Sequence, residues 1–207
     1  MKSASTTALC ALFTPLLVVW AAGLASSPGS QEAPDSREPS GSESSGEARK
    51  PVTVFLVRHA ETAESTLTQR DPALSAEGTQ RARDLARLLS KAGVTHLFAS
   101  EYARTGSTLA PLAAAAGLEV EVIAAREQGR QVEALRALAP GSIAVVCGHS
   151  NTVPGLVAAL GGQARELAGD PRSGPTLPHD AYDRLFVLTL PAGEGALAQS
   201  IELRFGT

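Results

Sequence analysis

Short apolar runs alternate with amphipathic or alanine-rich segments through residues 51–207. The first run, from Val52 to Val57, is rich in β-branched residues and has the length of a buried strand. The pattern predicts strands at 52–57, 94–100, 118–124, 142–147, 183–190 and 196–205, and helices at about 75–91, 104–116, 131–138 and 151–160. Such alternation indicates a largely parallel sheet covered on both faces. We therefore predict an α/β fold, a three-layer α/β/α sandwich with an antiparallel edge strand where the last two strands form a hairpin.

Residues at the ends of the predicted elements support these boundaries. Ser75-Ala76-Glu77-Gly78 has the composition of a helix N-cap. Gly117 follows the second helix, as a glycine stop does. Residues 161–181 are rich in Gly and Pro and predict a long loop.

The N-terminal segment has the layout of a secretory signal peptide. Lys2 provides positive charge, Ala8 to Ala22 is apolar, and Gly23-Leu24-Ala25 is a candidate cleavage site. Because residues 8–25 approach the roughly 20 residues of a membrane span, an uncleaved anchor is the alternative. We expect a signal peptide at 1–25 and a secreted or periplasmic protein, with no stable membrane association after cleavage.

The rest of the chain divides into a linker and one domain. Residues 26–50 contain no Val, Ile, Leu, Met or aromatic residue, so they cannot bury a core and predict a disordered linker. Residues 51–207 have the length of a single domain, the expected catalytic domain. The whole chain has a net charge of −3 at pH 7, which does not favour nucleic acid or an anionic membrane as a partner. The sequence leaves the oligomeric state open.

Polar residues suited to phosphate chemistry follow three of the predicted strands. Arg58 and His59 follow the first strand, Arg104 begins the helix after the second, and His149 follows the fourth. In a parallel sheet, the carboxyl ends of the strands meet at one edge, where ligands bind. Two arginines, two histidines and two helix N-termini at that edge would form an anion site.

A histidine in such a site can act as a nucleophile. Neutral imidazole can attack phosphorus and form a covalent phosphoenzyme, which divides hydrolysis into two easier steps. Neighbouring arginines disfavour protonation of the ring by charge repulsion, so His59 would stay nucleophilic near pH 7. Phosphoryl transfer depends mainly on positioning and on stabilising the charge of the equatorial oxygens. Arginines and a second histidine can do this alone, and the histidines lack metal-ligand spacing, so we expect neither a metal site nor a cofactor.

Four short motifs, taken in order, carry a resemblance to a known family. They are Arg58-His59-Ala60-Glu61-Thr62, residues 71–82, Ser100-Glu101-Tyr102-Ala103-Arg104-Thr105, and Gly148-His149-Ser150-Asn151. With these motifs the chain resembles the histidine phosphatase superfamily, also called phosphoglycerate mutase-like, and its small phosphatase branch. The resemblance covers essentially all of residues 51–207.

The resemblance implies a role for each matching side chain. His59 would be the phosphorylated nucleophile, and Arg58, Arg104 and His149 would form the rest of the phosphate pocket. Thr62 falls in a loop that often adds a side-chain contact to phosphate.

The general acid is less well defined by the resemblance. Many members of the family protonate the leaving oxygen with a Glu that follows the third strand, and Glu127 is the nearest candidate. The residues around Glu127 depart from the family's usual pattern. Asp180 is a second candidate. The short phosphohistidine phosphatases of the superfamily lack this acid, so a site with no dedicated acid is the third alternative.

These features predict an exported, metal-independent phosphatase that hydrolyses a phosphomonoester, or a related phosphoryl group, through phospho-His59. A phosphomutase and a catalytically silent module that binds phosphorylated ligands are the alternatives. Loops 62–74 and 161–181 carry small and polar residues without an aromatic clamp, which favours a small phosphorylated substrate. The sequence does not identify that substrate.

Several other polar residues are interpreted as structural. We expect Glu61 to pair with a nearby arginine, and the arginines from Arg81 to Arg87 to form a solvated helix face. Cys147 is expected to be a buried thiol. His96 is expected to be an ordinary strand histidine, and His179 an exposed loop residue.

Overall fold

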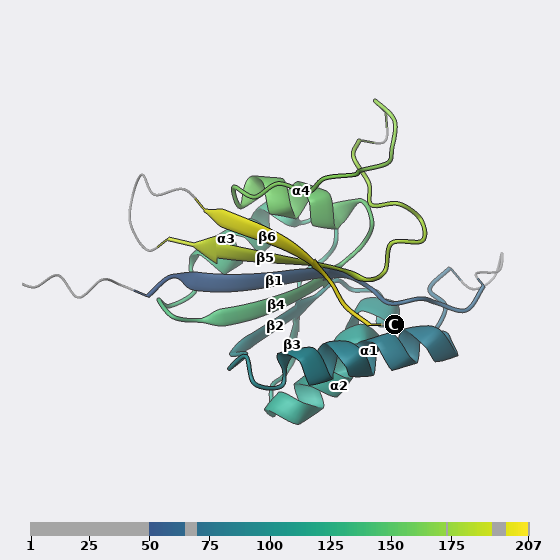
Figure 1. Cartoon of the computed structure of the whole chain (residues 1–207), viewed down its shortest axis with the longest axis horizontal. Coiled ribbons are helices and arrows are strands. Elements are labelled where there is room, and N and C mark those ends of the chain that lie inside the picture. The colour runs from purple at the N-terminus through teal and green to yellow at the C-terminus, as the bar shows by residue number, and fades with distance from the viewer. Residues whose placement is uncertain (1–49, 65–69, 173, 192–197, 207) are drawn as a thin grey trace, which may run out of the picture. The chain divides into compact units, whose positions relative to one another are not determined.

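A six-stranded mixed sheet with helices on both faces forms the fold (Figure 1). The computed structural model describes residues 50–64, 70–172, 174–191 and 198–206, all within the unit Gly46–Thr207. The predicted signal peptide and all but the last residue of the predicted linker lie outside the described residues. Within the described ranges, no helix is both long enough and apolar enough to cross a membrane.

Each predicted element is found, with its boundaries shifted by a few residues at most. The strands are β1 (Val52–Arg58), β2 (His96–Ala99), β3 (Val120–Val122), β4 (Ile143–Gly148), β5 (Arg184–Leu190) and β6 (Gln199–Arg204). The helices are α1 (Ala76–Leu89), α2 (Ala103–Ala116), α3 (Gln128–Arg136) and α4 (Thr152–Ala159).

The start of α3 shows why the boundaries shift. This helix begins at Gln128 rather than at residue 131. The Glu127 amide donates to the Ala124 carbonyl at 2.8 Å, and the Gln131 amide donates to the Glu127 carbonyl at 3.1 Å. Backbone hydrogen bonds define this turn, and the apolar periodicity of a sequence does not report them.

The strand directions in the sheet, whose order is β3-β2-β4-β1-β5-β6, confirm the predicted, mostly parallel arrangement. The first four strands in this order are parallel. β5 runs antiparallel to both neighbours, so the predicted hairpin of β5 and β6 lies at one edge. The register aligns Val57 of β1 and Ala99 of β2 with Cys147 of β4. The residues that follow these strands therefore emerge together at the carboxyl edge of the sheet.

Two apolar cores, one on each face of the sheet, hold the helices and confirm the three layers. Val54 and Leu56 of β1 belong to the core beneath α3 and α4, whereas Val57 belongs to the core beneath α1 and α2. Cys147 is buried in the second core, and burial raises the pKa of its thiol to about 12. The prediction of a buried thiol at Cys147 is confirmed.

The start of α1 packs against the loop that follows β1. Ser75 Oγ accepts a hydrogen bond from the Gly78 amide at 3.0 Å, which confirms the predicted N-cap. Gly78 lies so close to Glu61 that an added Cβ would be 2.0 Å from the Glu61 carbonyl oxygen. Because backbone atoms cannot give way as a flexible side chain can, glycine is required here.

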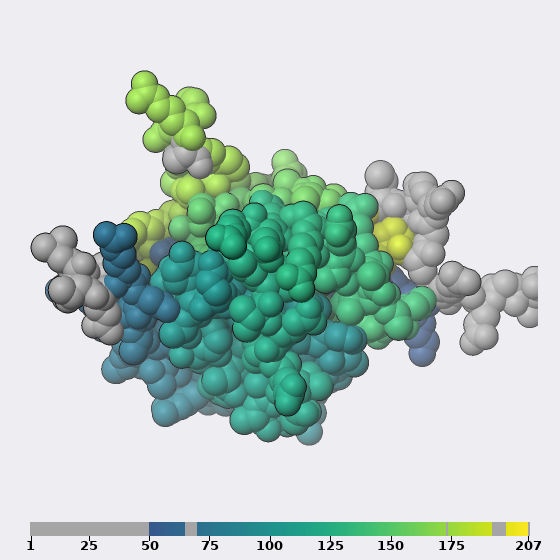
Figure 2. Space-filling model, turned by 180° about the vertical axis from the view of Figure 1, so that it is seen from behind, coloured from purple at the N-terminus to yellow at the C-terminus, as the bar shows by residue number. Residues whose placement is uncertain are grey.

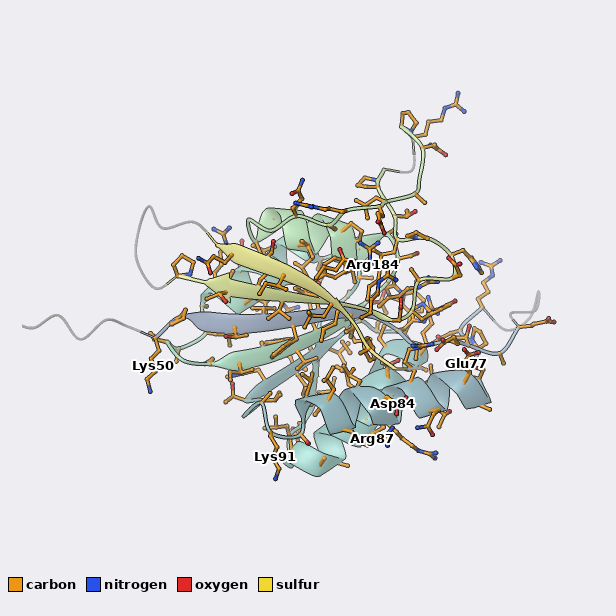
Figure 3. All side chains as sticks on the ribbon, viewed as in Figure 1. Lys50, Glu77, Asp84, Arg87, Lys91 and Arg184 are labelled. Carbon is orange, nitrogen blue, oxygen red and sulfur yellow. The ribbon has the colours of Figure 1, made fainter. Side chains whose placement is uncertain are left out.

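Arg184 fastens the long loop before β5 to the edge of the sheet. Its side chain is almost fully buried and binds the Glu202 carboxylate of β6, with Nε–Oε1 at 2.6 Å and Nη2–Oε2 at 2.8 Å. The same guanidinium donates to the Arg165 carbonyl at 2.6 Å, and Figure 3 labels it where β5 meets this loop. Residues further along the loop project from the surface (Figure 2). The sequence pattern did not predict a buried ion pair here.

Candidate active site

A pocket of about 560 Å³ opens at the carboxyl edge of the sheet. The His59 amide donates to the Gly148 carbonyl at 2.9 Å, which joins the loop that follows β1 to the last residue of β4. The pocket is lined by His59, Glu101, Tyr102, Arg104, Ala125, Arg126, His149, Ser150, Asn151 and Thr152. The structure thus brings together three of the predicted site residues: His59, Arg104 and His149.

His59 has one ring nitrogen bound to the backbone and one left for chemistry. Its Nδ1 lies 2.8 Å from the Ala60 carbonyl oxygen. Because a carbonyl can only accept, this contact places the ring proton on Nδ1 and the lone pair on Nε2. The His59 ring centroid lies 5.4 Å from that of His149, so the two rings share one site.

A hydroxyl connects the loop that carries His59 to α2. The Ala60 amide donates to Thr108 Oγ1 at 3.0 Å, and Thr108 Oγ1 in turn donates to the Arg104 carbonyl at 2.8 Å. Thr108 is buried, so this chain of hydrogen bonds is shielded from water. It couples the position of the nucleophile to the helix that carries Arg104, a link that the sequence reading missed.

Arg104 lies in the first turn of α2 and is held from several sides. Its Nη1 binds Asp71 Oδ1 at 2.8 Å, and its Cζ lies 4.3 Å from the Tyr102 ring centroid. Asp71 Oδ2 also accepts from the Ala103 amide at 2.6 Å. Burial by itself would raise the pKa of Asp71, but the hydrogen bonds from Ala103 and Arg104 outweigh it and lower that pKa. Asp71 therefore stays ionised and positions Arg104 at the pocket.

His149 has a partner at each ring nitrogen. Ser100 Oγ lies 2.8 Å from Nε2, and Arg104 Nη2 lies 3.4 Å from Nδ1. Because a guanidinium can only donate, Nδ1 is the acceptor and Nε2 carries the proton. The His149 amide donates to Thr152 Oγ1 at 2.9 Å, which ties the residue to the start of α4.

Both histidines are neutral at physiological pH. Burial is the largest cause that lowers the pKa of His59 to about 4; the hydrogen bond to Ala60 opposes it, and the charges of Arg58 and Arg104 add to it. Burial, followed by the charge of Arg104, also lowers the pKa of His149 to about 4. An unprotonated His59 keeps its nucleophilic lone pair.

These pKa values predict where the two rings titrate. As the pH falls, His59 and His149 are expected to take up protons only near pH 4, well below the roughly 6.5 of an unperturbed imidazole. NMR titration of the ring Cε1–H signals, assigned with His59→Ala and His149→Ala, measures both midpoints. A midpoint at or above the unperturbed value of about 6.5 in phosphate-free protein would contradict the prediction.

Arg58 is buried beside the nucleophile, and the loop before β5 holds it. Its Nη1 donates to the carbonyls of His179 at 2.8 Å and Pro178 at 3.2 Å, and its Nη2 donates to Tyr182 Oη at 3.2 Å. Its Nε is buried and has no hydrogen-bond partner among the described residues. Arg58 is not one of the residues that line the pocket. Burial lowers its pKa, yet a guanidinium remains charged.

Glu61 pairs with an arginine as predicted, and that arginine corrects another prediction. Arg81 Nε and Nη2 lie 2.8 and 2.6 Å from Glu61 Oε1. The Arg81 side chain is only 11% exposed, whereas Arg83 and Arg87 are exposed. The prediction of a solvated face from Arg81 to Arg87 is therefore wrong for Arg81. The start of α1 packs on the loop after β1, and helix periodicity alone does not show this.

Three predicted residues, Thr62, Glu127 and Asp180, do not line the pocket. Thr62 pairs through its backbone with Leu74. Glu127 Oε2 lies 3.3 Å from Arg130 Nη1, and the Glu127 side chain is 39% exposed. Asp180 is exposed and lines a separate cleft of about 430 Å³. A role in catalysis stays a prediction for these residues.

Glu101 is a pocket carboxylate that the sequence reading missed. Its Oε2 accepts a hydrogen bond from the Ala125 amide at 2.7 Å, and this bond is the largest cause that lowers the pKa of Glu101. Glu101 is therefore ionised near neutral pH and acts as an acceptor. The sequence signal that could have identified Glu101 was its position in the third motif, two residues before Ala103.

The remaining histidines have the structural settings predicted for them. His96 Nδ1 lies 2.8 Å from Thr95 Oγ1, and its ring stacks on Phe98. The His179 side chain is exposed. In the part of the chain that the structure describes, no group of three or more His, Cys, Asp or Glu side chains is placed to hold a metal ion.

Comparison of the sequence with known proteins points to one family. Residues 54–127 match the model of the histidine phosphatase superfamily, branch 1. The chain is 42% identical over 73 residues to a probable phosphoglycerate mutase GpmB from Serratia proteamaculans, and 41% identical over 73 residues to one from an Enterobacter species. Each match covers 33% of this chain and 34% of the relative. The chain thus matches about a third of the length of these curated relatives.

Solved structures share the fold over a longer stretch. The protein histidine phosphatase SixA, complexed with tungstate, is 21% identical with a TM-score of 0.56, covering 73% of this chain and 96% of SixA. A mycobacterial glucosyl-3-phosphoglycerate phosphatase is 16% identical with a TM-score of 0.52, covering 76% of this chain and 98% of that protein. At these identities the likeness shows a common fold.

Proposed function

We propose that this chain, whose residues 54–127 match the histidine phosphatase superfamily, hydrolyses a phosphomonoester, or a related phosphoryl group, through a phosphohistidine formed on His59. The observation that carries the proposal is the setting of His59, whose Nδ1 is bound to the backbone and whose ring shares a pocket with Arg104 and His149. The charged guanidinium of Arg104 suits the oxygens of a phosphoryl group.

The proposed reaction has two steps. In the first, the Nε2 lone pair of His59 attacks phosphorus while the bond to the leaving oxygen breaks and that oxygen takes a proton. The phosphorylated ring is cationic, and its Nδ1–H stays bonded to the Ala60 carbonyl. In the second, water attacks phosphorus and loses a proton to solvent, and the N–P bond returns its electron pair to Nε2. Arg58 and Arg104 are proposed to stabilise the equatorial oxygens, and His149, whose ring nitrogens face Ser100 and Arg104, is proposed to position Arg104 in the phosphate pocket.

We propose that solvent supplies the proton for the leaving oxygen. Glu127 is engaged with Arg130, and Glu101 is held ionised, so neither is arranged as a proton donor. Substrates whose leaving group needs little protonation, such as aryl phosphates, should therefore react fastest. A dedicated general acid would make the rate depend less on the pKa of the leaving group.

Phosphate release from a series of aryl phosphates in the presence of EDTA tests the proposal. We expect turnover to survive chelation, and kcat/KM to fall steeply as the pKa of the leaving phenol rises, because kcat/KM reports the step in which the phenol leaves. Glu127→Gln should behave like Glu133→Gln, a matched control on the exposed side of α3. A loss of about 10²-fold or more in Glu127→Gln alone would instead identify Glu127 as the acid. A protein that binds phosphate but turns over no substrate would be the silent binding module.

A phosphomutase is the second candidate, because the curated relatives are named probable phosphoglycerate mutases. Transfer of the phosphoryl group to a sugar-phosphate acceptor in preference to water would support it.

Export through residues 1–25 is also proposed, with an uncleaved anchor as the alternative, because the apolar segment follows Lys2 and ends in small residues.

A further inference from the structure

We propose that Tyr182 is a positioning residue: together with the Pro178 and His179 carbonyls it fixes the Arg58 guanidinium so that the Nε–Nη2 edge is left for phosphoryl oxygens. The inference rests on the proposed phosphoryl chemistry, but it concerns binding, which is measured without turnover. Tyr182 belongs to the loop before β5 and lies far along the chain from the motif that contains Arg58.

The hydrogen bonds of Arg58 identify the free edge. A guanidinium has five N–H donors. The carbonyls of Pro178 and His179 use both protons of Nη1, and Tyr182 Oη uses one proton of Nη2. One proton on Nη2 and the single proton on Nε remain. These two nitrogens form one side of the planar group, and their parallel N–H bonds are the fork that grips two oxygens of a phosphoryl group.

The buried Nε points to a ligand. It is buried and has no hydrogen-bond partner among the described residues. A buried donor without a partner is uncommon in folded proteins because its desolvation is uncompensated. An oxygen of a phosphoryl group held by the adjacent His59 would supply the missing acceptor.

The Tyr182 ring holds Arg58 in a second way. The Arg58 Cζ lies 4.0 Å from the Tyr182 ring centroid, a cation–π contact in a buried setting. The same ring lies 6.1 Å from the His59 ring, measured between centroids. Tyr182 therefore contacts the guanidinium both with its ring and with its hydroxyl, which restricts the movement of Arg58.

The loop that supplies these contacts is itself anchored. The Leu177 amide donates to the Ser150 carbonyl at 2.8 Å, next to His149 in the fourth motif. On the other side, Asp183 Oδ1 binds Arg204 Nη1 at 2.7 Å. A clamp anchored at both ends can hold a side chain within the narrow range that phosphoryl transfer requires.

Binding of inorganic phosphate to the full chain tests the inference. In wild type, the Arg58 Nε–H signal in a ¹⁵N NMR spectrum is expected to move on addition of phosphate. Tyr182→Leu, which lacks ring and hydroxyl, should raise the Kd for phosphate by about 10- to 100-fold. Tyr182→Phe keeps the ring and should recover most of this loss, with a Kd within about threefold of wild type.

A double-mutant cycle with Arg58→Lys separates positioning from a general structural effect. Lysine presents one point charge without a fork, so Tyr182→Leu should cost little more in this background. An unchanged Kd in Tyr182→Leu, or the same loss in both backgrounds, would overturn the inference. If Tyr182→Leu does not fold, Tyr182→Phe in the same cycle and the Arg58 Nε–H shift decide the matter. Phosphate binding without hydrolysis in wild type would refute the proposed function and leave this inference standing.

Discussion

Replacing His59 by alanine is expected to lower kcat/KM for an aryl phosphate by roughly 10⁴- to 10⁶-fold, the range seen when a catalytic nucleophile is removed. The physical reason is that His59 Nε2 carries the lone pair proposed to attack phosphorus. His149 cannot replace it, because its Nδ1 accepts from Arg104 and its Nε2 faces Ser100. Steady-state kinetics and trapping of an acid-labile phosphoprotein measure the loss.

His96→Ala is the matched control for this prediction. His96 begins β2, away from the carboxyl edge, where it contacts Thr95 and Phe98. Its removal should leave kcat/KM and the phosphoenzyme unchanged. Activity that persists in His59→Ala at the level of His96→Ala would exclude the phosphohistidine mechanism.

Replacing Arg104 by alanine is expected to lower kcat/KM by about 10²- to 10³-fold, the usual cost of removing one preorganised donor to a charged transition state. Arg104 lines the pocket and contacts His149, so its charge lies where the phosphoryl oxygens are proposed to sit. The change also leaves the ionised Asp71 carboxylate without its partner at the pocket. Both effects act against a dianionic substrate, and the ratio of kcat/KM between wild type and variant measures them.

Two further variants define the role of Arg104. Arg104→Lys keeps a charge but loses the planar fork and the stacking on Tyr102, so its activity should lie between wild type and Arg104→Ala. Arg83→Ala removes an exposed arginine of α1 and should match wild type. Equal activity in Arg104→Ala and Arg83→Ala would show that Arg104 takes no part in phosphoryl binding.

Local sequence features predicted most of the fold and part of the site. Apolar runs and caps located every strand and helix, because burial periodicity and helix ends are encoded within a few residues. The same features placed Arg58-His59, Arg104 and His149 at strand ends or at a helix start. Parallel pairing then required that their loops meet at one edge, and the register of β1, β2 and β4 shows that they do.

Contacts between residues far apart in the sequence could not be predicted from these local features. Arg81 was assigned to solvent because helix periodicity could not report that its helix packs on Glu61. Glu101 lines the pocket, where its carboxylate accepts a hydrogen bond from the Ala125 amide. Ala125 lies in the loop after β3, and the position of that loop depends on the pairing of β3 with β2. Glu127, the leading candidate for the acid, lies beside Arg130 instead of in the pocket.

The sequence by itself determined the alternation of strands and helices, the strand ends that carry the chemistry, and the identity of the candidate nucleophile. The tertiary structure alone decided which nitrogen of His59 carries the lone pair and which carboxylate enters the pocket. It alone also decided that residues 178–182 clamp Arg58. Periodicity and capping act over a few neighbouring residues, whereas a tautomer, a pocket wall or a guanidinium clamp depends on groups that only the folded chain brings within hydrogen-bond distance.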